Sequence, residues 1–128
     1  MSILIDKQKT FEMIFNGSYV VDKSENIIGF KINPNGNINL RCICTGRDFE
    51  RMSSVVESAS IINAVNGKPM LRTSVMCRMI MINFVNEIEV SSETESQNFK
   101  VTTDLVNQIQ YDVIKAISQK WLEVTDGR

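Results

Sequence analysis

The chain has 128 residues, of which 43% are hydrophobic and 23% are charged, and its formal net charge is −1. This length and composition predict one soluble globular domain, residues 1–128, with a single core. The near-neutral charge without a basic cluster argues against nucleic acid and anionic membrane surfaces as partners. The longest apolar run, residues 75–85, is too short to span a bilayer.

The cysteine content and the first residues of the chain indicate the cellular compartment in which the protein is expected. The three cysteines are an odd number, which does not suit a fully paired disulfide framework. Residues 1–5 carry neither the basic region nor the long apolar region of a secretion signal. We therefore expect free thiols in a reducing, cytoplasmic compartment.

The N-terminal third predicts strands. Two strand-like runs, residues 11–15 and 18–21, flank Asn16-Gly17. An Asn-Gly pair in this setting is the strongest short-range signal of a hairpin turn, because both turn residues need positive φ. A second interpretation stays open for residues 2–15, which fit a helix in place of the first strand.

Two further strands follow after a polar turn at residues 22–26. They cover residues 27–32 and 38–44, and the residues between them, 33–37, are rich in turn formers. In the second of these runs apolar and polar residues alternate, as in a strand with one buried face. The buried face holds Ile38, Leu40, Cys42 and Cys44, and the opposite face holds Asn39 and Arg41.

The first predicted helix starts at about residue 46. Residues 45–48, Thr-Gly-Arg-Asp, resemble a capping box with Asp in place of Glu. Apolar residues then recur at helical spacing, at Phe49, Met52, Val56, Ala59 and Ile62. Asn66-Gly67 is typical of a helix C-cap, and Pro69 lies just beyond it.

The segment Leu71–Ile88 predicts a long helix that is apolar on nearly all sides. With Met70 it holds four of the seven methionines, whose flexible side chains fill cores or adapt to varied partners. A helix with so narrow a polar stripe is central in the domain or lies in an interface. A buried strand over Met79–Val85 is an alternative, but the length of the segment favours a helix.

Residues 91–98 are polar and acidic and predict a solvated loop. The last helix is expected to begin at Thr102 or Thr103, with Asp104 in its first turn. Apolar residues every four positions predict one buried stripe along its whole length, at Leu105, Ile109, Val113, Ile117 and Trp121. Tyr111 lies off this stripe and is expected to be exposed.

The chain offers little for catalysis. It has no histidine, which is the side chain most often used for proton transfer near neutral pH and the commonest metal ligand. Cys42 and Cys44 are too close in sequence for a zinc knuckle, and with Cys77 they give only three soft ligands, so we interpret all three as buried thiols. We predict no catalytic residue, no cofactor and no metal site.

The candidate partner-binding residues lie in the long apolar segment. They are Arg72, Met76, Arg78, Met79, Met81 and Phe84. The two arginines have two interpretations. Their apolar stems lie along the helix edge with the charge in water, or one of them pairs with a carboxylate or carbonyl group of a partner.

Between residues 45 and 124, the order of several short sequence segments resembles that of a known protein family. The segments that carry the resemblance are Gly46–Arg51, Ile82–Glu87, Phe99–Asn107, Tyr111–Ile114 and Ile117–Leu122. In this order they resemble the tail assembly chaperones of tailed bacteriophages and the related baseplate hub assembly chaperones. The resemblance implies a small acidic α+β protein that holds a tail component until assembly, and it supplies no catalytic residues.

We therefore predict an α+β fold in which an N-terminal antiparallel β-meander, about residues 10–44, is followed by three helices packed on one face, residues 46–124. The expected function is that of a non-catalytic assembly chaperone, in the host cytoplasm if the chain is phage-encoded. Its expected partner is a phage structural protein, and self-association into a homo-oligomer is a further expectation. The alternatives are a structural subunit of a tail or baseplate, a dimeric secretion chaperone and, last, a small enzyme.

Overall fold

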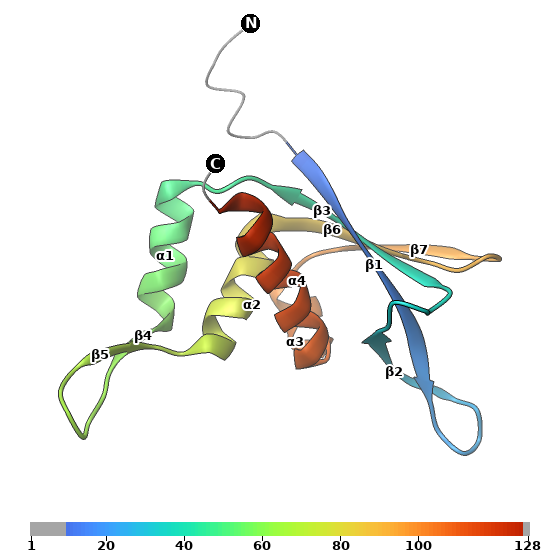
Figure 1. The fold of residues 1–128 in the computed structure, drawn as a ribbon, viewed down its shortest axis with the longest axis horizontal. Helices are drawn as coiled ribbons and strands as arrows, with labels where there is room; N and C mark the ends of the chain where they lie inside the picture. The colour runs from blue at the N-terminus through green and yellow to red at the C-terminus, as the bar shows by residue number, and fades with distance from the viewer. Residues whose placement is uncertain (1–9, 127–128) are drawn as a thin grey trace, which may run out of the picture.

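The structure is a computed structural model that describes residues 10–126. Helices pack against one face of a five-stranded antiparallel sheet with the strand order β2-β1-β3-β6-β7 (Figure 1). The strands are β1 (Thr10–Val21), β2 (Ile27–Ile32), β3 (Ile38–Thr45), β6 (Val85–Ser91) and β7 (Ser96–Lys100). The predicted α+β class and its N-terminal meander are confirmed, although two of the five strands come from the part predicted to be helical.

β1 runs without interruption through Asn16-Gly17, so the predicted hairpin turn at this pair is wrong. The connection from β2 to β3 crosses β1 at Gly17, because these two strands lie on opposite sides of β1. A Cβ atom at Gly17 would overlap the ring of Phe30, and one at Gly36 would overlap the carbonyl group of Gly17. The glycines are therefore needed for a close crossing of two chain segments and not for a turn.

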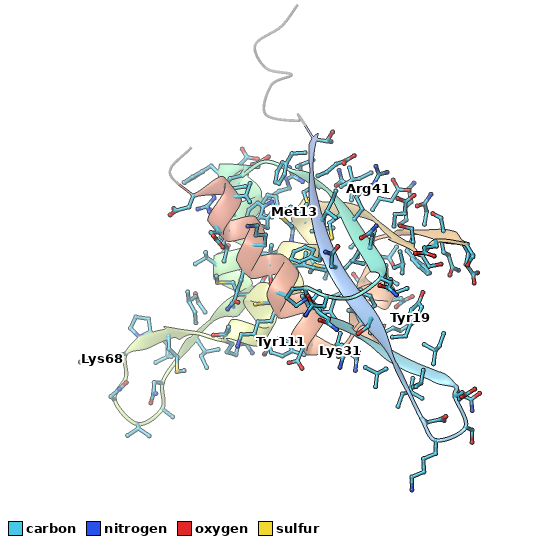
Figure 2. All side chains as sticks on the ribbon, turned by 45° about the vertical axis from the view of Figure 1, so that its right-hand side comes forward. Met13, Tyr19, Lys31, Arg41, Lys68 and Tyr111 are labelled. Carbon is cyan, nitrogen blue, oxygen red and sulfur yellow. The ribbon has the colours of Figure 1, made fainter. Side chains whose placement is uncertain are left out.

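The other strand predictions of this region are confirmed. β3 buries its predicted face, and Arg41 (Figure 2) lies on the opposite face. Arg41 forms ion pairs with Glu12 (3.1 Å) and Glu89 (3.4 Å). A polar open face is typical of an antiparallel sheet that is covered on one side. The helix alternative for residues 2–15 is wrong over residues 10–15, which belong to β1, and its remaining residues lie outside the described part of the chain.

Helix α1 (Phe49–Ala59) begins where Asp48 caps it. The Asp48 carboxylate accepts hydrogen bonds from the backbone N–H groups of Glu50 (2.9 Å) and Arg51 (3.3 Å). The bond from Arg51 contributes most to lowering the pKa of Asp48. The predicted capping box at residues 45–48 is wrong, because Thr45 is the last residue of β3 and the capping side chain is Asp48 itself.

A two-stranded hairpin that the sequence did not predict lies between α1 and α2 (Thr73–Phe84). Its strands are β4 (Ser60–Ile62) and β5 (Pro69–Leu71), and we call residues 60–71 the arm. The arm projects away from the sheet and helices (Figure 1). The predicted C-cap at Asn66-Gly67 lies in the tip of this hairpin, where Gly67 has a φ of +68°.

The long apolar segment changes from helix to strand between Phe84 and Val85, so the helix predicted over Leu71–Ile88 is too long. From Glu87 to Val90 acidic and apolar residues alternate, and β6 pairs with β3 on one side and with β7 on the other. The solvated loop predicted at residues 91–98 is therefore the end of a β-hairpin. The alternative of a strand over Met79–Val85 is also wrong, because this segment is helical up to Phe84.

The predicted last helix is divided into α3 (Thr103–Gln108) and α4 (Tyr111–Thr125). Thr102 caps α3, as one of the two predicted caps, through a hydrogen bond from the backbone N–H of Leu105 (3.2 Å). At the break, Gln110 Oε1 accepts a hydrogen bond from the backbone N–H of Phe30 (2.9 Å). The break between α3 and α4 therefore places the Gln110 side chain beside the edge strand β2, where it satisfies one backbone N–H group of that strand.

Trp121 joins three elements in the core. Its ring is fully buried and stacks on Phe84 of α2, with 4.3 Å between ring centroids, and its Nε1–H donates to the Thr45 carbonyl of β3 (2.9 Å). The predicted stripe of the last helix is confirmed in its α4 part, where Val113, Ile117 and Trp121 are buried. Its α3 part, Leu105 and Ile109, is only half-buried.

Candidate functional site

Exposed apolar side chains are concentrated on α1 and the arm. Of the twelve large hydrophobic side chains that are exposed among residues 10–126, seven lie there, and we call them the α1–arm surface. They are Phe49, Val56, Ile61, Ile62, Val65, Met70 and Leu71. The other five lie on β1 and β2. A gathering of apolar residues at the surface is typical of a protein–protein interface.

Helix α1 has an inner and an outer apolar face. Val55 and Ala59 are fully buried against the body of the molecule. The predicted stripe lies largely on the outer face, where Phe49 is 84% exposed and Val56 is 39% exposed. The spacing therefore predicts the helix correctly only up to Ala59, which faces the core. Phe49 and Val56 face solvent, and Ile62 lies beyond the helix in β4, so the predicted helix was too long.

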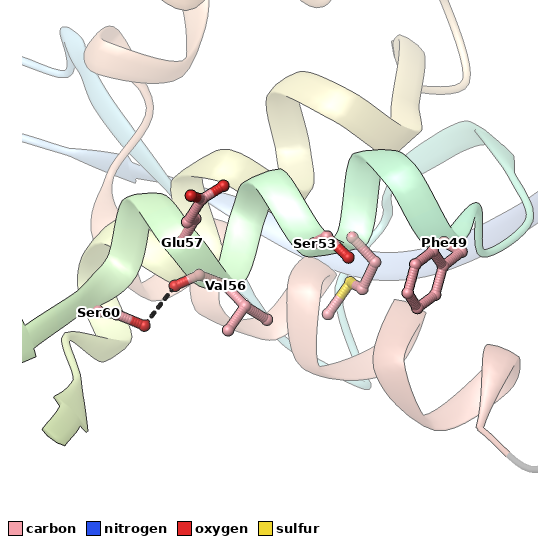
Figure 3. Close-up of a pocket in the computed structure, with 6 residues that line it drawn as sticks. Phe49, Ser53, Val56, Glu57 and Ser60 are labelled. Carbon is pink, nitrogen blue, oxygen red and sulfur yellow. Dashed lines mark hydrogen bonds between the residues drawn. The ribbon is translucent and has the colours of Figure 1, made fainter.

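The outer face of α1 forms a shallow groove of about 420 Å³ (Figure 3). It is lined by Phe49, Met52, Ser53, Val56, Glu57 and Ser60. The Ser60 hydroxyl group donates to the Val56 carbonyl (2.7 Å), so this polar group is satisfied within the helix end. The Phe49 and Val56 side chains point to the same side of α1, whereas the Glu57 carboxylate points to the other side (Figure 3). The groove therefore presents mainly apolar side chains.

The tip of the arm is held by Asn63. Its carbonyl accepts from the N–H of Gly67, its Oδ1 accepts from the N–H of Val65, and its own N–H donates to the Lys68 carbonyl, each at 2.8 Å. All six residues of β4 and β5 are exposed, and Val65 is 95% exposed. Lys68 lies far from the sheet and helices (Figure 2). The arm is thus an ordered projection with apolar side chains in solvent.

Arg72, one of the predicted partner-binding residues, fixes the base of the arm to α1. Its backbone N–H donates to the Ala59 carbonyl (2.8 Å), and its Nη2 donates to the Ser58 carbonyl (2.7 Å). These bonds join the two ends of the arm where Ser60 pairs with Leu71. Arg72 therefore has a role within the chain, and its contact with a partner stays a prediction.

The predicted residues of α2 are divided between core and surface. Met81 and Phe84 are fully buried, and this burial contradicts a direct contact with a partner. Met76 and Met79 are half-buried and pack against the core. Their contact with a partner remains a prediction, but they do not belong to the α1–arm surface.

Arg78 lies at the surface of α2 over the ring of Tyr111, with 5.4 Å between its guanidinium carbon and the ring centroid. Its Nη1 donates to the carbonyl of Ser74 (3.4 Å), one turn earlier in the helix. Tyr111 is half-buried, so its predicted exposure is wrong. Arg78 fits the first of its two interpretations, a stem along the helix edge, while pairing with a partner stays a prediction.

The arm was not predicted, although the sequence carries a signal for it. Two short apolar runs, residues 60–62 and 69–71, flank a stretch that contains Asn66-Gly67. Short apolar runs around an Asn-Gly pair predict a hairpin. The preceding helical spacing led instead to a C-cap at the same pair.

All three cysteines lie in the described part of the chain. Cys42, Cys44 and Cys77 are buried free cysteines, as predicted. Burial raises the pKa of Cys42 and of Cys44 to about 12, so both thiols are protonated at neutral pH and are poor nucleophiles. Among residues 10–126, no three His, Cys, Asp or Glu side chains gather as metal ligands, and no helix has the length and apolar character to cross a membrane.

A second hollow, of about 180 Å³, lies between the sheet and helices α3 and α4. It is lined only by apolar residues: Leu40, Ile88, Val90, Phe99, Leu105, Ile109, Val113 and Ile117. A ligand site normally adds a few polar groups that orient the ligand. This hollow lacks them among its lining residues, so we interpret it as a packing gap.

Comparisons of the chain with protein-family models, with curated proteins and with solved structures found no match. The function is therefore inferred from the α1–arm surface and from the resemblance carried by residues 45–124.

Proposed function

We propose that this chain is a non-catalytic protein-binding module whose α1–arm surface covers an apolar segment of another polypeptide. The observation that carries this proposal is the gathering of seven exposed large hydrophobic side chains between Phe49 and Leu71. Apolar surface in water is unfavourable by about 25 cal/mol per Å², and contact with a partner removes this cost. The buried, protonated thiols and the scattered carboxylates support binding and not catalysis.

More specifically, the proposed function is that of an assembly chaperone for a phage tail or baseplate. The resemblance of residues 45–124 to those chaperones supplies the class of partner, a structural protein with apolar surface that is buried in the finished particle. A shallow groove and a thin arm suit such a temporary complex, because a small interface is released more readily than a large one. The chain would act in the cytoplasm of the host.

Photo-cross-linking from defined positions tests the proposal. A photo-reactive phenylalanine analogue is placed at Phe49 or Val65, and at Glu123 on the exposed side of α4 as the matched control. The chain is then co-expressed with tail and baseplate proteins one at a time. We expect cross-links to one of these proteins from the first two positions and none from the third. Cross-links from all three positions alike, or from none in a folded protein, would contradict the proposal.

The same experiment separates the chaperone from its nearest alternative, a permanent subunit. A chaperone leaves its partner, so it should be missing from purified tails that contain that partner. A structural subunit should be present in them in fixed stoichiometry.

A further inference from the structure

The first half of β1 is an open edge of the sheet. On one side β1 pairs with β3 along Thr10–Gly17, whereas on the other side β2 accompanies it only from Gly17 to Val21 (Figure 1). Among residues 10–126, no strand pairs with the side of residues 10–15 that faces away from β3. Unpaired backbone groups along such an edge are a template for another strand.

A hydrogen bond beside β2 shows which backbone groups face this edge. Asn33 follows β2, on the side of β1 opposite to β3, and its backbone N–H donates to the Asn16 carbonyl (2.8 Å). The carbonyl of Asn16 therefore points away from β3. In an antiparallel strand the N–H and C=O groups of every second residue point to the same edge. Those of Glu12 and Ile14 thus point away from β3 as well, and no turn or loop among residues 10–126 gives them a backbone partner.

The other two edge strands of the sheet are protected against such pairing. On β2, the backbone N–H of Phe30 is bound by the side chain of Gln110. On β7, four of the five residues are polar, Lys100 among them, and short polar strands with lysine discourage pairing. The open edge of β1 has neither protection, because Ile14 is 63% exposed and Glu12 is the one charged residue of residues 10–16.

A row of polar contacts on the open face of the sheet ends at this edge. The Ser96 hydroxyl group of β7 donates to Glu89 Oε2 of β6 (3.2 Å). Arg41 of β3 then pairs with Glu89 Oε1 (3.4 Å) and with Glu12 Oε1 of β1 (3.1 Å). The other carboxylate oxygen of Glu12 has no hydrogen-bond partner among the described side chains. A strand added beside β1 would continue the row with a basic side chain.

We propose that an extended segment of a partner polypeptide binds beside residues 10–15 as a sixth strand of the sheet. Its backbone bonds to the N–H and C=O groups of Glu12 and Ile14, and it carries lysine or arginine beside Glu12. Its alternate residues point to the other face of the sheet, where they are apolar and cover the half-buried rings of Phe11 and Phe15. This inference does not depend on the α1–arm surface.

Two short synthetic peptides with blocked ends test the charge at this edge. One has the sequence Val-Lys-Val-Thr-Val, and the other has glutamate in place of lysine. The lysine peptide should slow hydrogen exchange at the backbone amides of Glu12 and Ile14. It should also bind roughly threefold to tenfold more tightly than the glutamate peptide. In the Glu12→Lys variant this preference should be reversed, because the charge at the end of the row is reversed.

A matched pair of variants at Ile14 tests the backbone pairing. Ile14→Pro removes the N–H group that faces the edge and leaves the bonds to β3 in place, since proline is tolerated where the N–H of an edge strand faces solvent. Ile14→Thr changes the side chain but keeps this N–H. We expect Ile14→Pro to weaken binding of the lysine peptide roughly tenfold or more relative to Ile14→Thr. Unchanged amide exchange in β3 shows that both variants are folded.

Strand addition is wrong if neither peptide slows exchange at Glu12 and Ile14 at about millimolar concentration, or if Ile14→Pro binds as tightly as Ile14→Thr. It is also wrong if both amides are already protected in the chain alone. Protection that grows with protein concentration would assign the edge to a second copy, and protection that is lost on deletion of residues 2–9 would assign it to the same chain. None of these results bears on the proposed function, which the cross-links from Phe49 and Val65 test.

Discussion

Helices α1 and α4 each carry an apolar stripe at helical spacing, but the two stripes have opposite surroundings. On α4, Val113, Ile117 and Trp121 are buried in the core. On α1, Phe49 and Val56 are exposed, and the residues that face the body, Val55 and Ala59, are small. The α4 stripe therefore contributes to folding, whereas the outer stripe of α1 remains available for binding. Substitutions in α4 should change stability, and substitutions on the outer face of α1 should change association.

The largest effect is expected at Trp121. Its replacement by alanine removes a fully buried ring, its stacking on Phe84 and the hydrogen bond to the Thr45 carbonyl. Trp121→Ala should lower the free energy of unfolding by about 3–5 kcal/mol in urea denaturation. Lys115→Ala, at an exposed position of the same helix, should stay within about 0.5 kcal/mol of the parent. Equal stability of the two variants would show that α4 does not belong to the core.

Alkaline pH should weaken the same core. Burial raises the pKa of Cys42 and Cys44 from an ordinary value of 9.0 to about 12. The unfolded chain therefore loses these protons from pH 9 upward while the folded chain keeps them until about pH 12. Their contribution to stability is complete below pH 9 and is lost as the pH rises to 12, with a limiting slope of about 1.4 kcal/mol per pH unit for each thiol.

The double variant Cys42→Ala/Cys44→Ala provides the control for this pH dependence. The informative quantity is the difference in slope between the parent and the double variant under reducing conditions, because only this difference belongs to the two thiols. A shallower slope in the double variant is expected. Equal slopes would show that the two thiols are accessible to solvent in the folded protein.

Strict periodicity made part of this fold predictable. The alternation in β3 and the four-residue spacing in α4 each indicate both the element and its buried face, because each repeat matches the geometry of its backbone. The spacing in α1 also indicates a helix, but a helix with apolar residues on two sides does not reveal which side meets the core. The change from helix to strand after Phe84 was not predictable either, because neither glycine nor proline separates the two apolar segments.

The two Asn-Gly pairs show why the candidate site was missed. Asn16-Gly17 predicted a turn, but Gly17 is in a strand and makes room for a crossing segment. Asn66-Gly67 predicted a helix end, but Gly67 uses its positive φ in the tip of the arm. Glycine permits a close approach and a left-handed backbone equally well. Only the packing of distant segments decides between these uses, and a single sequence does not contain that information.

A smaller and more local effect is expected at Arg72. Arg72→Ala removes the side-chain hydrogen bond to the Ser58 carbonyl and leaves the backbone bond to Ala59 in place. Because the lost bond is exposed, global stability should fall by at most about 1 kcal/mol. Amide hydrogen exchange in β4 and β5 should become faster, while exchange in β3 stays unchanged. Arg78→Ala should leave the arm unaffected, and faster exchange there in both variants would show that Arg72 does not hold the arm.

The smallest effect on stability is expected at Phe49, where the contrast between the two helices is sharpest. Phe49 is 84% exposed, so Phe49→Ser should change the free energy of unfolding by no more than about 0.5 kcal/mol. The same substitution should weaken association with a protein partner that binds the α1–arm surface, since it removes a large aromatic side chain from the α1 groove. Val55→Ser is the matched control on the same helix, because Val55 is fully buried. It should cost about 1–3 kcal/mol, since it removes buried apolar volume from the core. If Phe49→Ser destabilises the chain as much as Val55→Ser does, the outer stripe of α1 belongs to the folded core, and its assignment as a binding surface is wrong.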